Sequence, residues 1–111
     1  MVFFVNKLTL NGPAEELERI YGAVADFMSG QPGLVGYTLL RSTTRPEVYL
    51  NVAEWTDLAS FDRARTQERF AGGERVTAVS SGERHLCEVV FRGGPSAGTL
   101  TPGTGAPGVA G

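Results

Sequence analysis

The feature that most constrains the fold of this chain is the order of its strand-like and helix-like segments, which differ in the spacing of their apolar residues. β-Branched and aromatic residues mark Val2–Leu10 as a strand, and a pattern with a period of 3.6 residues follows it. Two further strand patterns, Leu34–Ser42 and Glu47–Trp55, come next and are joined by a tight turn. A second helical pattern begins at Leu58, and His85–Arg92 has the pattern of a last strand. The predicted order is strand, helix, strand, strand, helix, strand.

The first helix has the clearest pattern. Gly12 and Pro13 start it, Pro13 suits the first helical position, and three glutamates stand where the helix dipole favours anions. One apolar stripe runs along it, made of Leu17, Ile20, Tyr21, Val24, Phe27 and Met28. The turn at 31–33 (QPG) ends this helix.

The second helix is predicted from a cap and two apolar positions. Thr56 or Asp57 can cap it, and Phe61 and Ala64 point inward. Phe70 is expected near its end, before two glycines at 72 and 73 break it. Residues 74–82 carry no clear pattern.

This order of elements is that of the split βαβ unit. It predicts an α+β, ferredoxin-like βαββαβ fold with four antiparallel strands in one sheet and both helices on one face. Several strands are apolar on both faces, so the face without helices needs a cover. A second copy of the domain is the natural cover, and we therefore expect a homodimer.

Composition bounds the domain and its partners. The chain of 111 residues has room for one domain, expected over 1–92, and 93–111 is a Gly/Pro-rich stretch expected to be a flexible tail. The net charge of -2, with scattered basic residues, predicts no nucleic-acid partner. No run approaches the roughly 20 apolar residues that span a bilayer and the start lacks a basic leader, so we expect no membrane partner and a cytoplasmic location.

Common catalytic motifs are missing from the sequence, which has one histidine and one cysteine. His85 and Cys87 share a strand face at i and i+2, but two ligands are too few for a resident metal ion. We therefore predict no metal site, and we expect Cys87 to be a buried structural thiol.

Three side chains with polar groups stand on strand faces that would look into an otherwise apolar space if they face the helices. Asn51 and Trp55 lie four residues apart, so the period of two places both on one strand face with Tyr49 and Ala53. A buried amide is costly unless it is hydrogen-bonded, so Asn51 either pairs with the backbone or is held for a ligand. Asn6 on the first strand poses the same alternative.

The segment QPGLVGYTLLRS, followed by YLNVAEWTDLASFDRA, resembles the antibiotic biosynthesis monooxygenase family. The resemblance covers about residues 3–92 and implies a dimeric α+β barrel. The pattern is similar to that of the cofactor-independent anthrone oxygenases of aromatic polyketide pathways, which implies a catalytic role for Asn51 and Trp55. The substrate-binding residues that it implies are Asn6, Tyr37, Arg41 and Phe61.

The implied activity is oxidation of an electron-rich aromatic polyketide, of the anthrone or naphthol type, by dioxygen without flavin or metal. The N–H groups of Asn51 and Trp55 would be aimed at the enolate oxygen of the substrate or at a peroxide intermediate. Two positions depart from the oxygenase pattern: Phe61 stands where those enzymes carry a tyrosine, and Arg41 where they carry a histidine.

Alternatives remain open at this point. They are a family member that needs external reduced flavin or quinol, a polyketide cyclase, and a dimer that binds a ligand without turnover. The haem-degrading branch resembles the chain at Asn6, but it uses a Trp and a His near the positions of Ala64 and 72–73 here. A pocket too small for three fused rings would favour the non-catalytic alternative.

Overall fold

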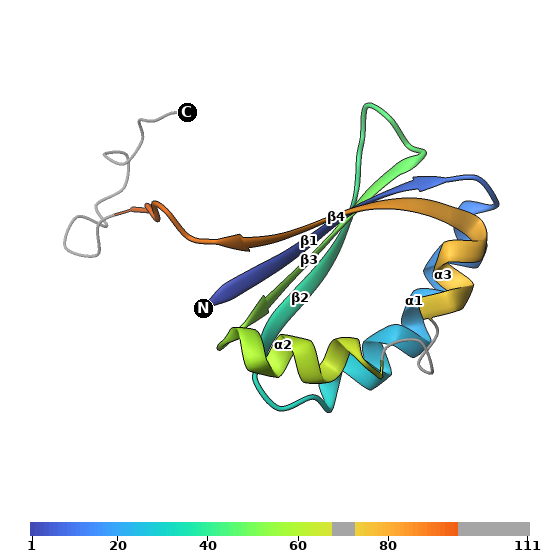
Figure 1. Ribbon diagram of the computed structural model, residues 1–111. Helices are drawn as coiled ribbons and strands as arrows, with labels where there is room; N and C mark the ends of the chain where they lie inside the picture. Colours follow the sequence, from blue (N-terminus) through green and yellow to red (C-terminus); the bar gives the residue numbers. More distant parts are fainter. Residues whose placement is uncertain (68–72, 96–111) are drawn as a thin grey trace.

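The computed structural model describes residues 1–67 and 73–95. Its elements are β1 (Val2–Leu10), α1 (Ala14–Ser29), β2 (Leu34–Arg41), β3 (Val48–Trp55), α2 (Leu58–Arg65), α3 (Gly73–Val79) and β4 (Ser80–Glu88). The four strands form one antiparallel sheet in the order β2-β3-β1-β4, and the helices lie on one side of it (Figure 1). The predicted ferredoxin-like α+β fold is confirmed.

Helix α1 packs the predicted stripe against the sheet. Leu17, Ile20, Tyr21 and Val24 are buried, while Phe27 and Met28 near its end are half-buried. Pro13 has an extended conformation and is the N-cap of α1. The sequence predicted it at the first helical position, which Ala14 occupies instead. Proline still suits the N-cap because it lacks an N–H that would need a partner.

The turn before β2 fixes the start of α2. Gly33 has a φ of 92°, and a Cβ there would lie 2.3 Å from the Ser60 hydroxyl. Its carbonyl accepts the Thr56 N–H at 2.8 Å, and the Asp57 carboxylate accepts the Ser60 N–H at 2.8 Å as the N-cap of α2. Only glycine combines this backbone conformation with so close a neighbour.

The largest difference from the predicted elements lies in the last third of the chain. Residues 73–79 form helix α3, and β4 begins at Ser80 and ends at Glu88 instead of spanning His85–Arg92. The register explains this, because nine residues of β1 pair with nine of β4, from Leu10 with Ser80 to Val2 with Glu88. Strands β2 and β3 are each one residue shorter than predicted. Phe70 and residues 96–111 of the expected tail lie outside the described residues.

The hydrophobic core is divided by a polar pair of residues. Leu8 faces Tyr49 across β1 and β3, Phe4 faces Ala53, and Asn6 faces Asn51 between these two apolar pairs. One apolar cluster, around Leu8 and Tyr49, packs on α1 and α3. A second cluster surrounds Trp55, and its members are Ala53, Trp55, Phe61 and Ala64. The asparagine pair lies at the boundary between the two clusters.

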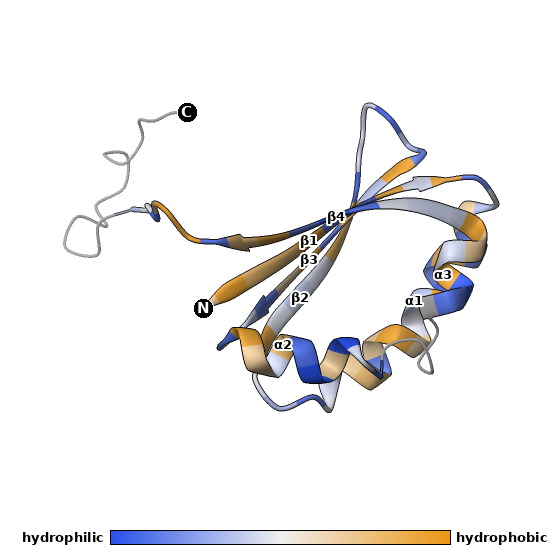
Figure 2. Cartoon of the chain, in the orientation of Figure 1, coloured by the Kyte–Doolittle hydropathy of each residue, from blue (hydrophilic) through white to orange (hydrophobic). Residues whose placement is uncertain are grey.

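The face of the sheet without helices is bare and partly apolar (Figures 1 and 2). Leu40 and Leu50 pair there and are exposed, and Cys87 pairs with Phe3 on the same face. The expectation of a buried Cys87 is wrong for this chain alone, because its side chain points away from the helices. Within residues 1–67 and 73–95, no helix is long and apolar enough to cross a membrane.

Candidate active site

A small cavity lies between β3 and the helices, next to the polar pair. We call it the β3 cavity, and its lining residues are Phe4, Tyr21, Val24, Met28, Asn51, Trp55, Phe61, Ala64 and Arg65. Asn51 and Trp55 reach it from one face of β3, as the period of two predicted. The lining residues from α1 were predicted only as core positions, because a helical apolar stripe has the same pattern in a core and in a pocket wall.

Asn51 and Trp55 bring unpaired polar atoms into this cavity. Asn51 is 8% exposed and Trp55 is 1% exposed. The Asn51 Oδ1 and the Trp55 Nε1 have no hydrogen-bond partner among the described residues. Leaving a buried polar group unpaired costs about 1 to 3 kcal/mol, so native structures seldom keep two together without a function. Rotation of the amide exchanges its oxygen and its NH2, so Asn51 can offer a ligand either group.

Phe61 forms the aromatic wall of the β3 cavity. Its ring centroid lies 5.2 Å from that of Phe4 and 6.1 Å from that of Trp55, and the latter pair meets edge to face at 71°. These contacts hold the indole in place and keep water away from its N–H.

The β3 cavity is narrow as it stands. Its volume is about 20 Å³, which is room for about one water molecule. The cavity as it stands is thus too small for three fused rings, which is the size criterion that favours a dimer that binds a ligand without turnover. A fused aromatic ring system can enter only when lining side chains move. Met28 is half-buried and Arg65 exposed, so these two have the greatest freedom to do so.

Asn6 faces a second cavity on the other side of the polar pair. We call it the β4 cavity; it has a volume of about 260 Å³, and its lining residues are Asn6, Leu8, Val76, Thr77, Ser80, Ser81, Gly82 and Arg84. Asn6 is 8% exposed, and its Oδ1 also has no partner among the described residues. The predicted substrate-binding Asn6 is therefore adjacent to Asn51 but lines a different space.

Tyr37 packs behind Trp55 and does not line either cavity. Its hydroxyl donates to the carbonyl of Ala25 at 3.4 Å and lies 3.4 Å from the Ser29 hydroxyl. Its ring contacts the cluster around Trp55. This position supports the indole from the β2 side.

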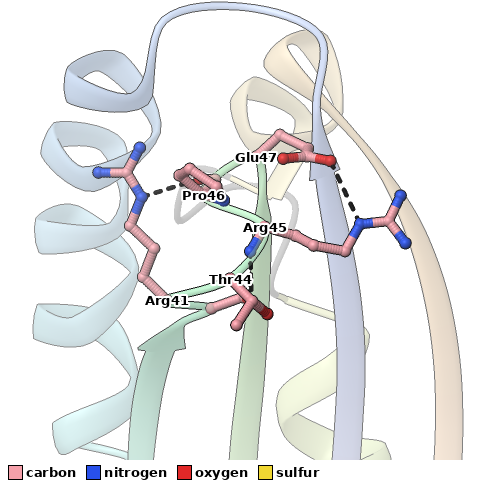
Figure 3. Close-up of polar contacts among 6 residues, drawn as sticks. Arg41, Thr44, Arg45, Pro46 and Glu47 are labelled. Carbon is pink, nitrogen blue, oxygen red and sulfur yellow. Dashed lines mark hydrogen bonds and ion pairs between the residues drawn. The ribbon is translucent and has the colours of Figure 1, made fainter.

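Arg41 is the last residue of β2, at the turn of the β2–β3 hairpin (Figure 3). Its Nε donates to the Pro46 carbonyl at 2.8 Å, and its guanidinium lies 5.2 Å from the centre of the Tyr49 ring and 3.8 Å from Glu18. The structure thus places Arg41 away from both cavities, in contacts that hold the hairpin against α1.

Tyr49 anchors the same end of the molecule. Its hydroxyl donates to the Glu18 carboxylate, and burial, together with this contact, raises the pKa of Tyr49 above its ordinary value of 10.0. Because the proton stays on the phenol, Tyr49 serves as a structural donor. From the sequence, Tyr49 was predicted only to share a strand face with Asn51.

Few charged groups border the β3 cavity. Among its described lining residues Arg65 is the charged one, and it lies 3.8 Å from Asp62. The chain's one histidine, His85, pairs with Val5 on the opposite face of the sheet and contacts Glu83 at 2.7 Å. The cavity therefore combines two neutral hydrogen-bonding groups and an aromatic wall with one arginine, Arg65.

The chain is similar in sequence to known proteins over most of its length. The family model "Antibiotic biosynthesis monooxygenase" matches residues 1–74. Deoxynogalonate monooxygenase from Streptomyces nogalater is 38% identical over 86 residues, which are 77% of this chain and 73% of that protein.

Two solved structures show the same fold. SnoaB, described as a cofactor-independent oxygenase from Streptomyces nogalater and solved as an asparagine-to-alanine variant, is 35% identical with a TM-score of 0.77, over 82% of this chain and 94% of that chain. The haem degrader MhuD from Mycobacterium tuberculosis, solved with two haems in its active site, is 27% identical with a TM-score of 0.64, over 85% of this chain and all of that one. From the family match and these relatives, the chain belongs to the antibiotic biosynthesis monooxygenase family and is a monooxygenase.

Proposed function

We propose that the chain oxidises an electron-rich aromatic polyketide of the anthrone or naphthol type with dioxygen, without a flavin or metal cofactor. The observation that carries the proposal is the pair of unpartnered groups, the Asn51 amide and the Trp55 indole N–H, at a cavity bordered by aromatic rings. The likeness to a monooxygenase and to a cofactor-independent oxygenase supports the same chemistry.

The substrate supplies most of the reactivity. The CH2 group of a hydroxylated anthrone loses a proton readily, because the negative charge spreads onto the ring oxygens. The resulting anion gives one electron to O2, and the two radicals combine into a peroxide. Loss of water from the protonated peroxide leaves a carbonyl, so CH2 and O2 become C=O and H2O.

The protein stabilises the charge that develops on oxygen. The Trp55 Nε1–H and the Asn51 NH2 can donate to the enolate oxygen, and the aromatic wall excludes water, which strengthens both hydrogen bonds. Neither group is a base at neutral pH, so the acidity of the substrate itself starts the reaction.

Haem chemistry has less support from these residues. A proximal histidine would have to reach the cavity, and His85 faces the opposite side of the sheet. A homodimer through the bare face of the sheet is part of the proposal, because Leu40, Leu50 and Cys87 are exposed there.

The experiment is incubation of the protein with anthrone under 18O2, without added cofactor, followed by mass analysis. The proposal predicts a quinone carrying one 18O atom, formed only with oxygen present. A product that also forms without oxygen would indicate a cyclase, and dependence on added reduced flavin would indicate the flavin-requiring alternative. The control variant is Asn11→Ala, because Asn11 is an exposed asparagine outside both cavities and should leave the rate unchanged.

A further inference from the structure

The β4 cavity contains groups that the proposed oxidation does not use. Asn6 lies at its floor, 8% exposed and with an unpartnered Oδ1, and Arg84 borders it on the neighbouring strand. Arg84 faces Asn6 directly in the register of β1 and β4. Among the described residues its guanidinium makes no ion pair or hydrogen bond, although six other ion pairs are present in this part of the chain.

The described lining of this cavity has a cation and neutral polar groups but no carboxylate. Hydroxyls come from Thr77 and Ser80, and the amide comes from Asn6. Thr77 and Ser80 already donate to backbone carbonyls of α3, so their oxygens are free to accept or to bind water. Arg84 is a donor available to an incoming acceptor. Rotation of the Asn6 amide exchanges its oxygen and its NH2, so Asn6 can turn its NH2 toward the same group. A planar guanidinium beside an amide suits a carboxylate.

Gly82 shapes the cavity around Asn6. A Cβ on Gly82 would lie 2.9 Å from the Asn6 Oδ1 and 3.4 Å from its Nδ2. The amide therefore rests directly on the backbone of β4, and any side chain at position 82 would displace it. This close approach holds Asn6 beside Arg84.

The β4 cavity is adjacent to the β3 cavity. Asn6 and Asn51 are paired neighbours on β1 and β3, and each lines one of the two cavities. Arg84 is one strand further, so about two strand spacings, roughly 10 Å, separate Asn51 from Arg84. That distance is comparable with the long axis of three fused six-membered rings.

We infer that the β4 cavity is an anion subsite, in which Arg84 and Asn6 hold a carboxylate carried by the aromatic substrate. The inference rests on the proposed function for the identity of the substrate. It adds the residues that would orient such a substrate, with the reacting ring over Asn51 and the carboxylate paired with Arg84. The subsite sets orientation and affinity, and the chemistry stays at Asn51 and Trp55.

Binding and turnover are measured separately to test it. Anthraquinone-2-carboxylate and its methyl ester serve as unreactive probes, with binding followed by the fluorescence of Trp55, the chain's one tryptophan. The intact protein should bind the acid about tenfold or more tightly than the ester. Arg84→Gln should abolish this preference, and Arg84→Lys should restore part of it. Gly82→Ala should weaken binding of the acid by displacing Asn6.

The matched control is Arg45→Gln, because Arg45 is an exposed arginine on the β2–β3 hairpin, 3.5 Å from Glu47 (Figure 3). It is not among the lining residues of either cavity. The variant should leave the preference for the acid unchanged. An equal affinity for acid and ester in the intact protein, or a preference that survives Arg84→Gln, would overturn the subsite. Turnover of anthrone is assayed in parallel. If anthrone is oxidised but the acid binds no more tightly than the ester, the anion subsite is wrong and the oxygenase proposal stands. If the acid binds more tightly but anthrone is not oxidised, the oxygenase proposal is wrong and the subsite stands.

Discussion

Asn6 and Asn51 face each other across β1 and β3, both almost fully buried and both with an unpartnered amide oxygen. The apolar pairs on either side, Leu8 with Tyr49 and Phe4 with Ala53, show that this position could have continued the core. Because both amide oxygens are buried without a partner, the pair lowers the stability of the fold at this position of the sheet. That place is where the two cavities meet.

Replacement of Asn51 by leucine should raise stability and lower activity together. Leucine has a similar volume and needs no hydrogen-bond partner, so the free energy of unfolding should rise by about 1 to 3 kcal/mol. Each kcal/mol corresponds to about 4 to 8 °C in Tm for a domain of this size. Calorimetry and the anthrone assay check both effects, with Asn11→Ala as the control. A variant that keeps full turnover would remove Asn51 from the mechanism.

Replacement of Trp55 by phenylalanine should lower kcat by about 100-fold. The phenyl ring keeps the aromatic contact with Phe61 but has no N–H, so the loss should fall on kcat and leave KM nearly unchanged. Steady-state kinetics measure the two constants, and circular dichroism confirms the fold. A rise in KM at constant kcat would mean that the indole only binds substrate.

Replacement of Tyr49 by phenylalanine should cost about 1 kcal/mol of stability, since Glu18 is partly exposed and solvent weakens its hydrogen bond. The pKa of Tyr49 is raised in the folded state, so the unfolded chain ionises first as pH rises. The contribution is therefore complete below pH 10 and decreases as pH rises through the folded pKa. Urea titrations of the native protein and Tyr49→Phe at several pH values measure their free energies of unfolding. The difference between the two free energies should shrink only above pH 10, and a difference that also shrinks at neutral pH would contradict this account.

Replacement of Asp57 by alanine should lower Tm, and replacement by asparagine should recover most of the loss, because both Asp and Asn accept the Ser60 N–H. Hydrogen bonds from Ser60 lower the pKa of the Asp57 carboxyl. The stabilisation is therefore present above the ordinary value of 3.8 and is lost as pH falls through the folded pKa. Thermal melts at pH 7 and pH 3 check this: the Tm difference between the native protein and Asp57→Ala should shrink at the lower pH, while the difference between Asp57→Asn and Asp57→Ala should persist because asparagine does not titrate. A difference between the native protein and Asp57→Ala that widens at pH 3 would be contrary to the capping role.

Much of the fold could be predicted from local patterns. Val2–Leu10 was predicted with its observed bounds, and the stripe from Leu17 to Val24 is buried as expected. The error at β4 has a physical cause, because Ser80–Arg84 is polar and is a strand only through its pairing with β1. Tertiary pairing of that kind leaves no local signal.

The candidate site was predictable only in part. The period of two placed Asn51 and Trp55 together on β3, and Phe61 also lies at the β3 cavity. Tyr37 and Arg41 lie elsewhere: the Tyr37 hydroxyl reaches the Ala25 carbonyl on α1, and the Arg41 side chain reaches the Pro46 carbonyl in the turn of the hairpin. Strand periodicity gives the face of a side chain and not the group that it reaches. Arg84 lies between the stretch 74–82, which had no clear pattern, and the predicted last strand His85–Arg92. No pattern in the sequence therefore marked it as a neighbour of Asn6.

The central claim is that Asn51 and Trp55 donate hydrogen bonds to the oxygen of a ring system in the β3 cavity. A crystal structure of the protein with bound anthraquinone tests it most directly. The account predicts a quinone oxygen about 2.7 to 3.1 Å from both the Trp55 Nε1 and the Asn51 amide, with Met28 and Arg65 displaced. A quinone bound on the bare face of the sheet, or one whose oxygens contact neither residue, would contradict it.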